Sequence, residues 1–170
     1  MTYQKNLNIT SQEMILIEGL LPQYRFIQAF SPNESDAYDR IISNEIFSSV
    51  GENYDPIKWR KLDENIFYFV FLLGNNAIGA ARIEFTYLPA KQAILRFIAI
   101  DKLHQNQGHG KHLLKYIIEW VSQQGARKLF LHAIVHATDF YRKSGFVEMS
   151  FDDPRRLLDS PVVDLGMTLQ

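Results

Sequence analysis

The sequence predicts an α/β protein of the α+β kind, with a mixed, mostly antiparallel twisted sheet of about six to seven strands and helices on both faces. Two patterns favour this fold class. Runs of β-branched and aromatic residues between residues 66 and 100 are separated by turn residues, as in an antiparallel meander. Residues 94–135 then read as strand, glycine-rich turn, helix and strand, which is a parallel crossover within that sheet.

The first part of the chain is predicted to alternate helix, strand and helix. Residues 10–13 (Thr-Ser-Gln-Glu) have the spacing of a capping box ahead of the apolar run 14–21, so a short helix is expected before Pro22. Residues 24–30 are predicted to form a strand. Residues 33–50 carry apolar side chains at helical spacing and are predicted to form the next helix.

The middle of the chain changes to strand spacing at residue 66. Residues 66–73 and 77–87 are predicted strands joined by a turn at residues 74–76, and residues 91–100 form the third strand of the meander. Residues 108–124 return to helical spacing, with the apolar residues Leu113, Leu114, Ile117, Ile118 and Val121 on one face.

The last part of the chain is predicted to complete the sheet. Gly125 stands where a left-handed helix cap belongs, and residues 127–135 follow as a strand. Residues 138–144 are expected to form a short helix closed by glycine. Residues 146–151 and 162–169 are expected to form a final pair of strands.

Composition limits the classes of partner. Eighteen lysines and arginines nearly cancel nineteen aspartates and glutamates, so no strong field is available to hold a nucleic acid or an anionic membrane, and neither partner is expected. The chain has no cysteine, which excludes disulfides, cysteine zinc sites and a thiol nucleophile, and fits a reducing compartment. Residues 1–6 lack the apolar core of a signal peptide, so a cytoplasmic protein is expected.

The length of the chain predicts its domain organisation. A chain of 170 residues is long enough for one compact core and too short for two, and it contains no repeat or linker-like stretch. We therefore expect residues 1–170 to form a single domain, with residues 1–22 as an N-terminal extension or extra helix.

A glycine-rich segment between a strand and a helix predicts a phosphate site. Gly108 and Gly110 allow a ligand to approach the backbone closely, and the free N–H groups of the first helical turn can bind a pyrophosphate. Lys111 adds a positive charge at the same end. The segment is neither a P-loop nor a Rossmann fingerprint, which would need a third glycine where Leu113 stands.

Two segments in the right order resemble the signatures of the GNAT superfamily of acetyltransferases. Residues 105–110 (Gln-Asn-Gln-Gly-His-Gly), after the strand that ends in Ile-Ala-Ile-Asp, are similar to (Arg/Gln)-x-x-Gly-x-(Gly/Ala). Residues 137–146 (Ala-Thr-Asp-Phe-Tyr-Arg-Lys-Ser-Gly-Phe) are similar to the downstream Ala-x-x-Phe-Tyr-x-x-x-Gly-Phe segment. In motif the chain is most similar to the small ElaA-like branch, although Ile134 replaces the polar residue that this branch usually carries there.

The resemblance implies an N-acetyltransferase that passes the acetyl group of acetyl-CoA directly to a primary amine in a ternary complex. It also implies that the fourth and fifth strands splay apart to hold the pantetheine arm. The implied cofactor-binding residues are Ile98, Ala99, Ile100, Gln105, Asn106, Gln107, Gly108, His109, Gly110, Lys111 and Phe140. The acceptor is expected to be a small molecule or a peptide, and the protein a monomer or homodimer. The alternative is an inactive module of this fold that binds CoA as a sensor or docking unit.

The resemblance also implies catalytic residues. Tyr141 matches the family tyrosine that protonates the departing thiolate. Candidates for the base that takes the amine proton are Glu84 and His136, with His132 and Asp139 as further possibilities, because these residues are expected at or near the splayed strands. No metal site is expected, because no carboxylate completes a ligand set with the histidines near the phosphate turn.

Arg96 interrupts an apolar strand that is expected near the middle of the sheet. A buried guanidinium needs a partner, so either Glu84 on the adjoining strand pairs with it or it faces an open cleft and binds a carboxylate of the acceptor. Under the second alternative Arg96 and His132 are predicted to bind the substrate. Both alternatives are compatible with the sequence.

Overall fold

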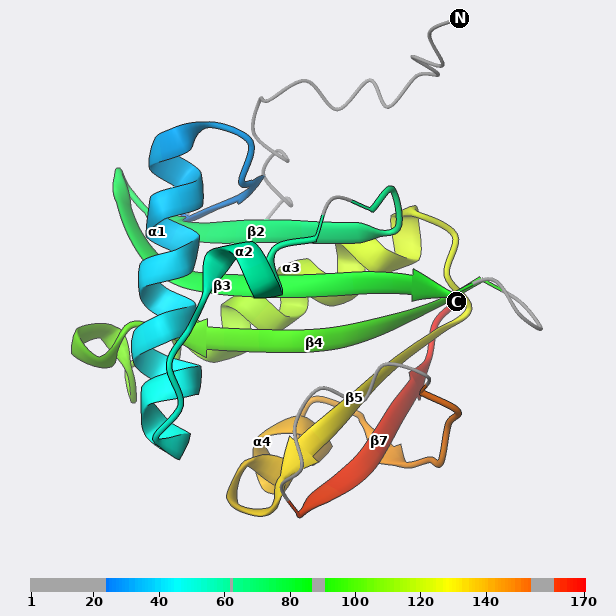
Figure 1. Ribbon diagram of the computed structural model, residues 1–170. Helices are drawn as coiled ribbons and strands as arrows, with labels where there is room; N and C mark the ends of the chain where they lie inside the picture. The colour runs from blue at the N-terminus through cyan, green and yellow to red at the C-terminus, as the bar shows by residue number, and fades with distance from the viewer. Residues whose placement is uncertain (1–23, 62, 87–90, 154–160) are drawn as a thin grey trace, which may run out of the picture.

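The computed structural model describes residues 24–61, 63–86, 91–153 and 161–170. Within these residues seven strands form one sheet in the order β1-β2-β3-β4-β5-β7-β6 (Figure 1). Only β4 and β5 pair in parallel, and the other neighbours are antiparallel. The strands are β1 (Tyr24–Gln28), β2 (Ile66–Leu73), β3 (Asn76–Thr86), β4 (Gln92–Ile100), β5 (Lys128–Ile134), β6 (Val147–Glu148) and β7 (Val162–Thr168). The predicted mixed sheet is confirmed, whereas the helix expected before Pro22 lies outside the described residues.

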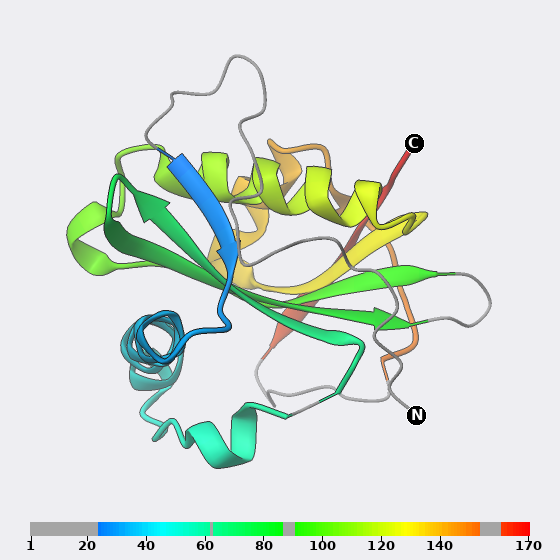
Figure 2. The ribbon, with the colours of Figure 1, turned by 90° about the horizontal axis from the view of Figure 1, so that it is seen from above.

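Helices cover both faces of the sheet, as the sequence predicts. Figure 2 shows α1 and α2 on one face and α3 and α4 on the other. The helices are α1 (Pro32–Ile42), α2 (Pro56–Trp59), α3 (His109–Gln123) and α4 (Thr138–Arg142), with short π or 3-10 turns η1 (Ser43–Phe47), η2 (Ser48–Val50), η3 (Lys102–His104) and η4 (Val135–Ala137). No helix of the described residues is long and apolar enough to cross a membrane.

Two apolar cores, one on each face, hold these layers together. The larger core packs α3 against the sheet, with Trp120 contacting the rings of Phe67, Phe69 and Phe85. The smaller core packs α1 and η1 against the opposite face. Side chains that alternate along a strand therefore enter different cores, which fixes the register of the central strands.

The helix predicted over residues 33–50 is broken into three kinds of turn. Ser31 caps α1 and forms a capping box with Glu34. The chain then widens into the π-helix η1, whose longer turn places Phe47 in the same core as Ile42, and both side chains are fully buried. An uninterrupted α-helix would have turned Phe47 away from Ile42, so burial of both accounts for the irregularity.

The final strand pair is shorter than predicted. β6 pairs with β7 at Val147 and Glu148 only, and the N–H of Met149 adds one further bond to the carbonyl of Asp164 at 3.1 Å. The chain then leaves the sheet, and the ring of Phe151 stacks on Phe130, with centroids 4.6 Å apart. This departure brings the next residues over β5.

Gly79 permits a close approach between β3 and β4. A Cβ atom at Gly79 would lie 3.0 Å from the carbonyl oxygen of Ala99 and 2.8 Å from the side chain of Ile100. The side chain could rotate away, but the backbone oxygen could move only if β4 moved. Gly79 thus sets the position of the end of β4.

We predict that Gly79→Ala lowers the free energy of unfolding by about 1–3 kcal/mol, because the added methyl overpacks this contact. Gly110→Ala is the matched control, since its Cβ would meet Phe140 and Ile100 at ordinary distances of 3.7 and 3.8 Å. The control should be neutral or slightly more stable, as alanine favours helix. Equal denaturant midpoints for the two variants would contradict the close approach.

Candidate active site

The parallel strands β4 and β5 part after three paired positions. The last pair joins Ile94 to Phe130, and beyond it the two strands diverge in a wedge that opens toward the end of β4 (Figure 1). β3 continues to pair with β4 as far as Ile100. Because neighbouring residues of a strand direct their N–H and C=O groups to opposite sides, alternate residues of β4 direct these groups into the wedge. This is the region where the pantetheine arm is predicted to bind.

A β-bulge at Arg96 changes which side chains of β4 face each core. Arg82 of β3 is opposite Phe97, and the next residue, Ile83, is opposite Leu95, so Arg96 is an extra residue. Leu95 belongs to the core under α3, whereas Phe97 belongs to the core under α1. Ile98 and Ile100, after the bulge, therefore face α3 and α4.

Two residues of the predicted phosphate turn have positive φ. Gly108 has φ +85° and precedes α3, and Asn106 also lies in the left-handed region with φ +60°. Asparagine tolerates this region better than most residues, and glycine does so freely. Within the described residues no side chain caps the first turn of α3. The N–H of Lys111 donates to the carbonyl of Gly108 at 3.1 Å, whereas the N–H groups that come before it at a helix start lack intrahelical acceptors and can bind an anion.

Contacts to the other face of the sheet hold this turn in place. The amide of Gln105 donates to the carbonyl of Ile100 at 2.8 Å and to Glu45 of η1 at 2.9 Å. Glu45 also accepts a bond from the N–H of Lys102 at 3.1 Å. The amide of Gln107 donates to the carbonyl of Leu103 at 3.0 Å. The side chains of Gln105 and Gln107 are thus used within the turn, which leaves its backbone and Lys111 as groups for phosphate.

His109 lies in the first turn of α3. Its Nδ1 is 2.7 Å from the hydroxyl of Tyr24. Burial, and to a smaller extent the nearby His104 and His112, lower the pKa of His109. The imidazole is therefore held in its neutral form more readily than a free histidine.

The two segments that resemble family motifs meet at the wedge. A Cβ on Gly110 would lie 3.7 Å from the ring of Phe140 and 3.8 Å from Ile100 at the end of β4. Tyr141 lies beside Phe140 and Phe146, with ring centroids 5.1 and 5.8 Å apart. Burial raises the pKa of Tyr141, so its hydroxyl is a weaker acid than that of an exposed tyrosine and is protonated at neutral pH.

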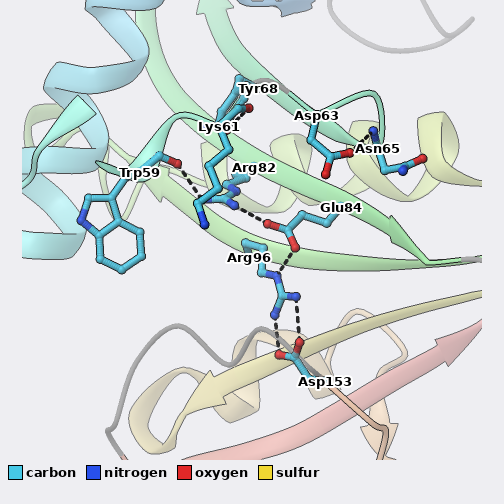
Figure 3. A network of polar contacts seen from close by, with 9 residues as sticks. All are labelled: Trp59, Lys61, Asp63, Asn65, Tyr68, Arg82, Glu84, Arg96 and Asp153. Atoms are coloured by element: carbon cyan, nitrogen blue, oxygen red, sulfur yellow. Dashed lines mark hydrogen bonds and ion pairs between the residues drawn. The ribbon is translucent and has the colours of Figure 1, made fainter. Parts of the chain in front are cut away.

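A network of buried charges lies on the face of the sheet that α1 and α2 cover (Figure 3). Glu84 accepts from the guanidinium of Arg82 with one carboxylate oxygen and from Nε of Arg96 with the other, at 2.8 Å. Arg82 also donates to the carbonyl of Trp59 at 2.9 Å. Arg96 donates two further bonds to Asp153, one of them at 2.7 Å. The side chain of Arg96 is only 3% exposed.

The network continues through the imidazole of His132. Nε2 of His132 is 2.7 Å from Asp153, and Nδ1 is 2.8 Å from Asp164 of β7. The ring stacks on Phe151 with centroids 4.6 Å apart. An ionised carboxylate only accepts hydrogen bonds, so both contacts require either hydrogen on both ring nitrogens or one protonated carboxyl group.

These contacts bear on the predicted roles of Arg96, Glu84 and His132. Every side-chain nitrogen of Arg96 has an acidic partner, which favours the alternative in which it is structural over the one in which it binds an acceptor carboxylate. Burial alone would lower the pKa of Arg96, but the bonds and charges of Asp153 and Glu84 outweigh it and raise that pKa. Both oxygens of Glu84 are likewise occupied by guanidinium groups, which leaves this carboxylate poorly placed to accept a proton from an amine.

The other candidate bases lie outside this network. His136 belongs to η4 and is exposed, and Asp139 of α4 is exposed beside Arg142, 3.8 Å away. The residues expected to hold CoA and Tyr141 thus lie on the α3 and α4 side or in the wedge, whereas Arg96, Glu84 and His132 lie on the opposite face. Among the described residues, no three histidine, aspartate or glutamate side chains are arranged to hold a metal ion.

Three members of the site were not predicted from the sequence. Asp153 and Glu45 complete contacts between segments that are far apart in the chain, and Arg82 joins Glu84 of its own strand to the carbonyl of Trp59. For Arg82 a signal was available, because it lies two residues before Glu84 on one strand and alternation places both side chains on one face. Asp153 follows a stretch without regular structure, where spacing carries no such information.

A sizeable cavity lies elsewhere. A space of about 850 Å³ is lined by residues in or next to β1, α2, β2 and α3, including Phe30, Ile57, Phe67 and Trp120. None of its described lining residues comes from β4, β5 or α4. The geometry of the wedge, rather than cavity size, therefore identifies the candidate active site.

The splayed parallel pair, the glycine turn before α3 and the segment at α4 define the class of protein. Residues 34–146, more than half of the chain, match the Acetyltransferase (GNAT) family. The chain belongs to this family. No curated protein is similar enough in sequence to count as a match.

Solved structures with the same fold are distant in sequence. FeeM, an N-acyl amino acid synthase from uncultured soil microbes, has a TM-score of 0.69 at 16% identity, covering 88% of this chain and 92% of FeeM. Escherichia coli ElaA has a TM-score of 0.68 at 14% identity, covering 84% of this chain and 97% of ElaA. The ribosomal-protein-S18-alanine N-acetyltransferase of the same species has a TM-score of 0.64 at 18% identity, covering 86% and 92%. At these identities the likeness concerns the fold.

We predict that Arg96→Met lowers the free energy of unfolding by about 3 kcal/mol. This value is at the low end of the destabilisation expected when one partner of a buried ion pair is removed. The reason is that Glu84 would still bind Arg82, and Asp153 would still contact His132. Arg40→Met is the control, since Arg40 pairs with Asp101 at 2.8 Å but its side chain is 49% exposed, and it should cost at most about 1 kcal/mol. If Arg96→Met lowered the free energy of unfolding only slightly and raised KM for acidic acceptors alone, Arg96 would instead be a substrate-binding residue.

Proposed function

We propose that this protein is an N-acetyltransferase that uses acetyl-CoA and acts on the primary amine of a small molecule or peptide. The observation that carries the proposal is the closeness of Phe140 and Ile100 to Gly110, where an added Cβ would lie 3.7 and 3.8 Å from them. It joins the phosphate turn, the tyrosine segment and the end of the splayed strand in one place. Family membership supports acetyl transfer in general, and this arrangement supports the particular cofactor.

The residues at the wedge fit the parts of CoA. A Cβ on Gly108 would have no heavy atom within 4 Å, so the side of the turn next to Gly108 is open to a pyrophosphate. The first turn of α3 offers N–H groups and the positive end of the helix dipole, and Lys111 adds a charge. The backbone of Ile98, Ala99 and Ile100 borders the wedge and would pair with the pantetheine arm.

The proposed chemistry assigns one role to each group. Bound acetyl-CoA supplies a thioester carbonyl that the amine attacks, so that a C–N bond forms and the C–S bond breaks. The Tyr141 hydroxyl gives its proton to the departing sulfur, and solvent restores it. The proton lost by the amine passes to water or to His136. We also propose that residues 1–170 act as a single domain.

We predict that Gly108→Val weakens CoA binding by at least about tenfold, because a branched side chain at φ +85° covers the N–H groups of the turn. Gly74→Val is the matched control. Gly74 has φ +60° and nothing within 4 Å of its added Cβ, so this variant carries similar backbone strain far from the wedge. The measurement is calorimetric titration with CoA. Equal affinity in the two variants would contradict the assignment of the turn.

We predict that Tyr141→Phe lowers kcat by about a hundredfold or more, with little change in the affinity for acetyl-CoA, because the hydroxyl acts in the transition state. Phe146→Leu is a control for packing, since Phe146 is buried against the same ring and has no hydroxyl. Thiol release is measured against a panel of amines. Tight CoA binding without turnover of any amine in the parent protein would favour the inactive binding module.

A further inference from the structure

The side chain of Asp153 bridges the two strands that form the wedge. Its carboxylate accepts two bonds from the guanidinium of Arg96 on β4 and contacts Nε2 of His132 on β5 at 2.7 Å. The side chains of Arg96 and Asp153 are each only 3% exposed, and that of His132 is 16% exposed. These bonds are therefore largely shielded from water, which strengthens them.

The bridge stands at the vertex of the wedge. The last backbone pair of β4 and β5 joins Ile94 to Phe130, and Arg96 and His132 lie two residues farther along each strand. Beyond the last backbone pair, the carboxylate of Asp153 links the two strands through their side chains. The bulge that makes Arg96 an extra residue of β4 is at the same position.

Stacking on β5 holds Asp153 in place. Phe151 stacks on both Phe130 and His132, with ring centroids 4.6 Å apart in each case. Phe151 thus fixes the segment after β6 on β5, and the carboxylate of Asp153, two residues later, holds that segment against β4.

We propose that Arg96, Asp153 and His132 form a clasp that sets the opening of the wedge and so positions the pantetheine arm. Asp153 is a positioning residue in this proposal, because it acts through the two strands and not on the reacting atoms. The inference rests on the proposed function where it concerns CoA, but the clasp itself can be tested in the ligand-free protein. Because the strands are already apart and ordered, binding of the pantetheine arm would not have to spend free energy on separating or ordering them.

A natural control for the clasp is Asp164. It contacts the same imidazole at nearly the same distance, 2.8 Å, but it lies on β7, which pairs with β5 opposite His132. Its contact therefore does not cross the wedge. Asp164→Asn removes a carboxylate partner of His132 and leaves the link between β4 and β5 intact.

The first experiment measures amide hydrogen exchange in the ligand-free protein. Asp153→Asn offers one acceptor oxygen in place of two and cannot serve both nitrogens of Arg96 together with His132. We expect exchange to become about tenfold faster at residues 92–94 and 128–130, where the short parallel ladder frays from its open end. The ladder between β2 and β3, and the whole sheet of Asp164→Asn, should be unchanged.

The second experiment compares CoA with adenosine 3′,5′-bisphosphate, which carries phosphate groups but no pantetheine arm. In Asp153→Asn we expect the Kd of CoA to rise about fivefold to tenfold and the Kd of the bisphosphate to stay unchanged, because the clasp acts on the wedge and not on the turn before α3. A merely structural role would change both affinities together or neither. Asp164→Asn should change neither.

His132→Phe provides a second variant if Asp153→Asn does not fold. The ring can still stack on Phe151, and Arg96 keeps its bonds to Asp153, while the link to β5 is lost. Unchanged exchange at the ladder in this variant or in Asp153→Asn would overturn the clasp. Faster exchange with an unchanged ratio of the two affinities would overturn its positioning role. A parent protein that does not bind CoA would contradict the proposed function, while the exchange result would still decide the clasp.

Discussion

The wedge between β4 and β5 depends on a charged residue in an apolar strand. Arg96 is inserted as an extra residue, and its guanidinium is buried on the α1 side of the sheet among Glu84 and Asp153. A bulge bends a strand and increases its twist. This bulge also reverses which face of the sheet the side chains after it point to, so that they enter the opposite cores. Ile98 and Ile100 consequently face α3, where the phosphate turn lies, and the parting of the strands leaves backbone groups available to a ligand.

The buried guanidinium of Arg96 is tolerated because positive and negative side chains alternate around it. Two guanidinium groups, of Arg82 and Arg96, are interleaved with the carboxylates of Glu84 and Asp153, so each buried charge has at least one opposite neighbour. Desolvation makes buried ion pairs weak evidence for stability, and an apolar core could have been as stable. Their proposed value here is geometric, because the directed bonds link β3 to β4 and, through Asp153, β4 to β5 beyond their last backbone pair.

The parts of this structure that follow from the sequence are those encoded locally. The bounds of β2 and the left-handed Gly125 after α3 follow from spacing and residue type within one segment. The pairing of Arg96 with Glu84 was one of two alternatives, because neighbouring strands bring both residues together. The link to Asp153 could not be predicted, since it depends on the path of a segment without periodicity. The π-helix η1 was missed for a related reason, because packing in the same core as Ile42 overrides helical spacing there.

The same tertiary contacts connect the two faces of the sheet. Glu45 of η1, on the α1 side, holds the amide of Gln105 and the N–H of Lys102, and so reaches the turn that precedes α3. The π-helix that buries Phe47 also determines where this carboxylate lies. The proposed phosphate turn is therefore anchored by a helix that covers the opposite face of the sheet. A ligand that orders the turn would also constrain η1, because a bond of defined direction transmits the position of one to the other.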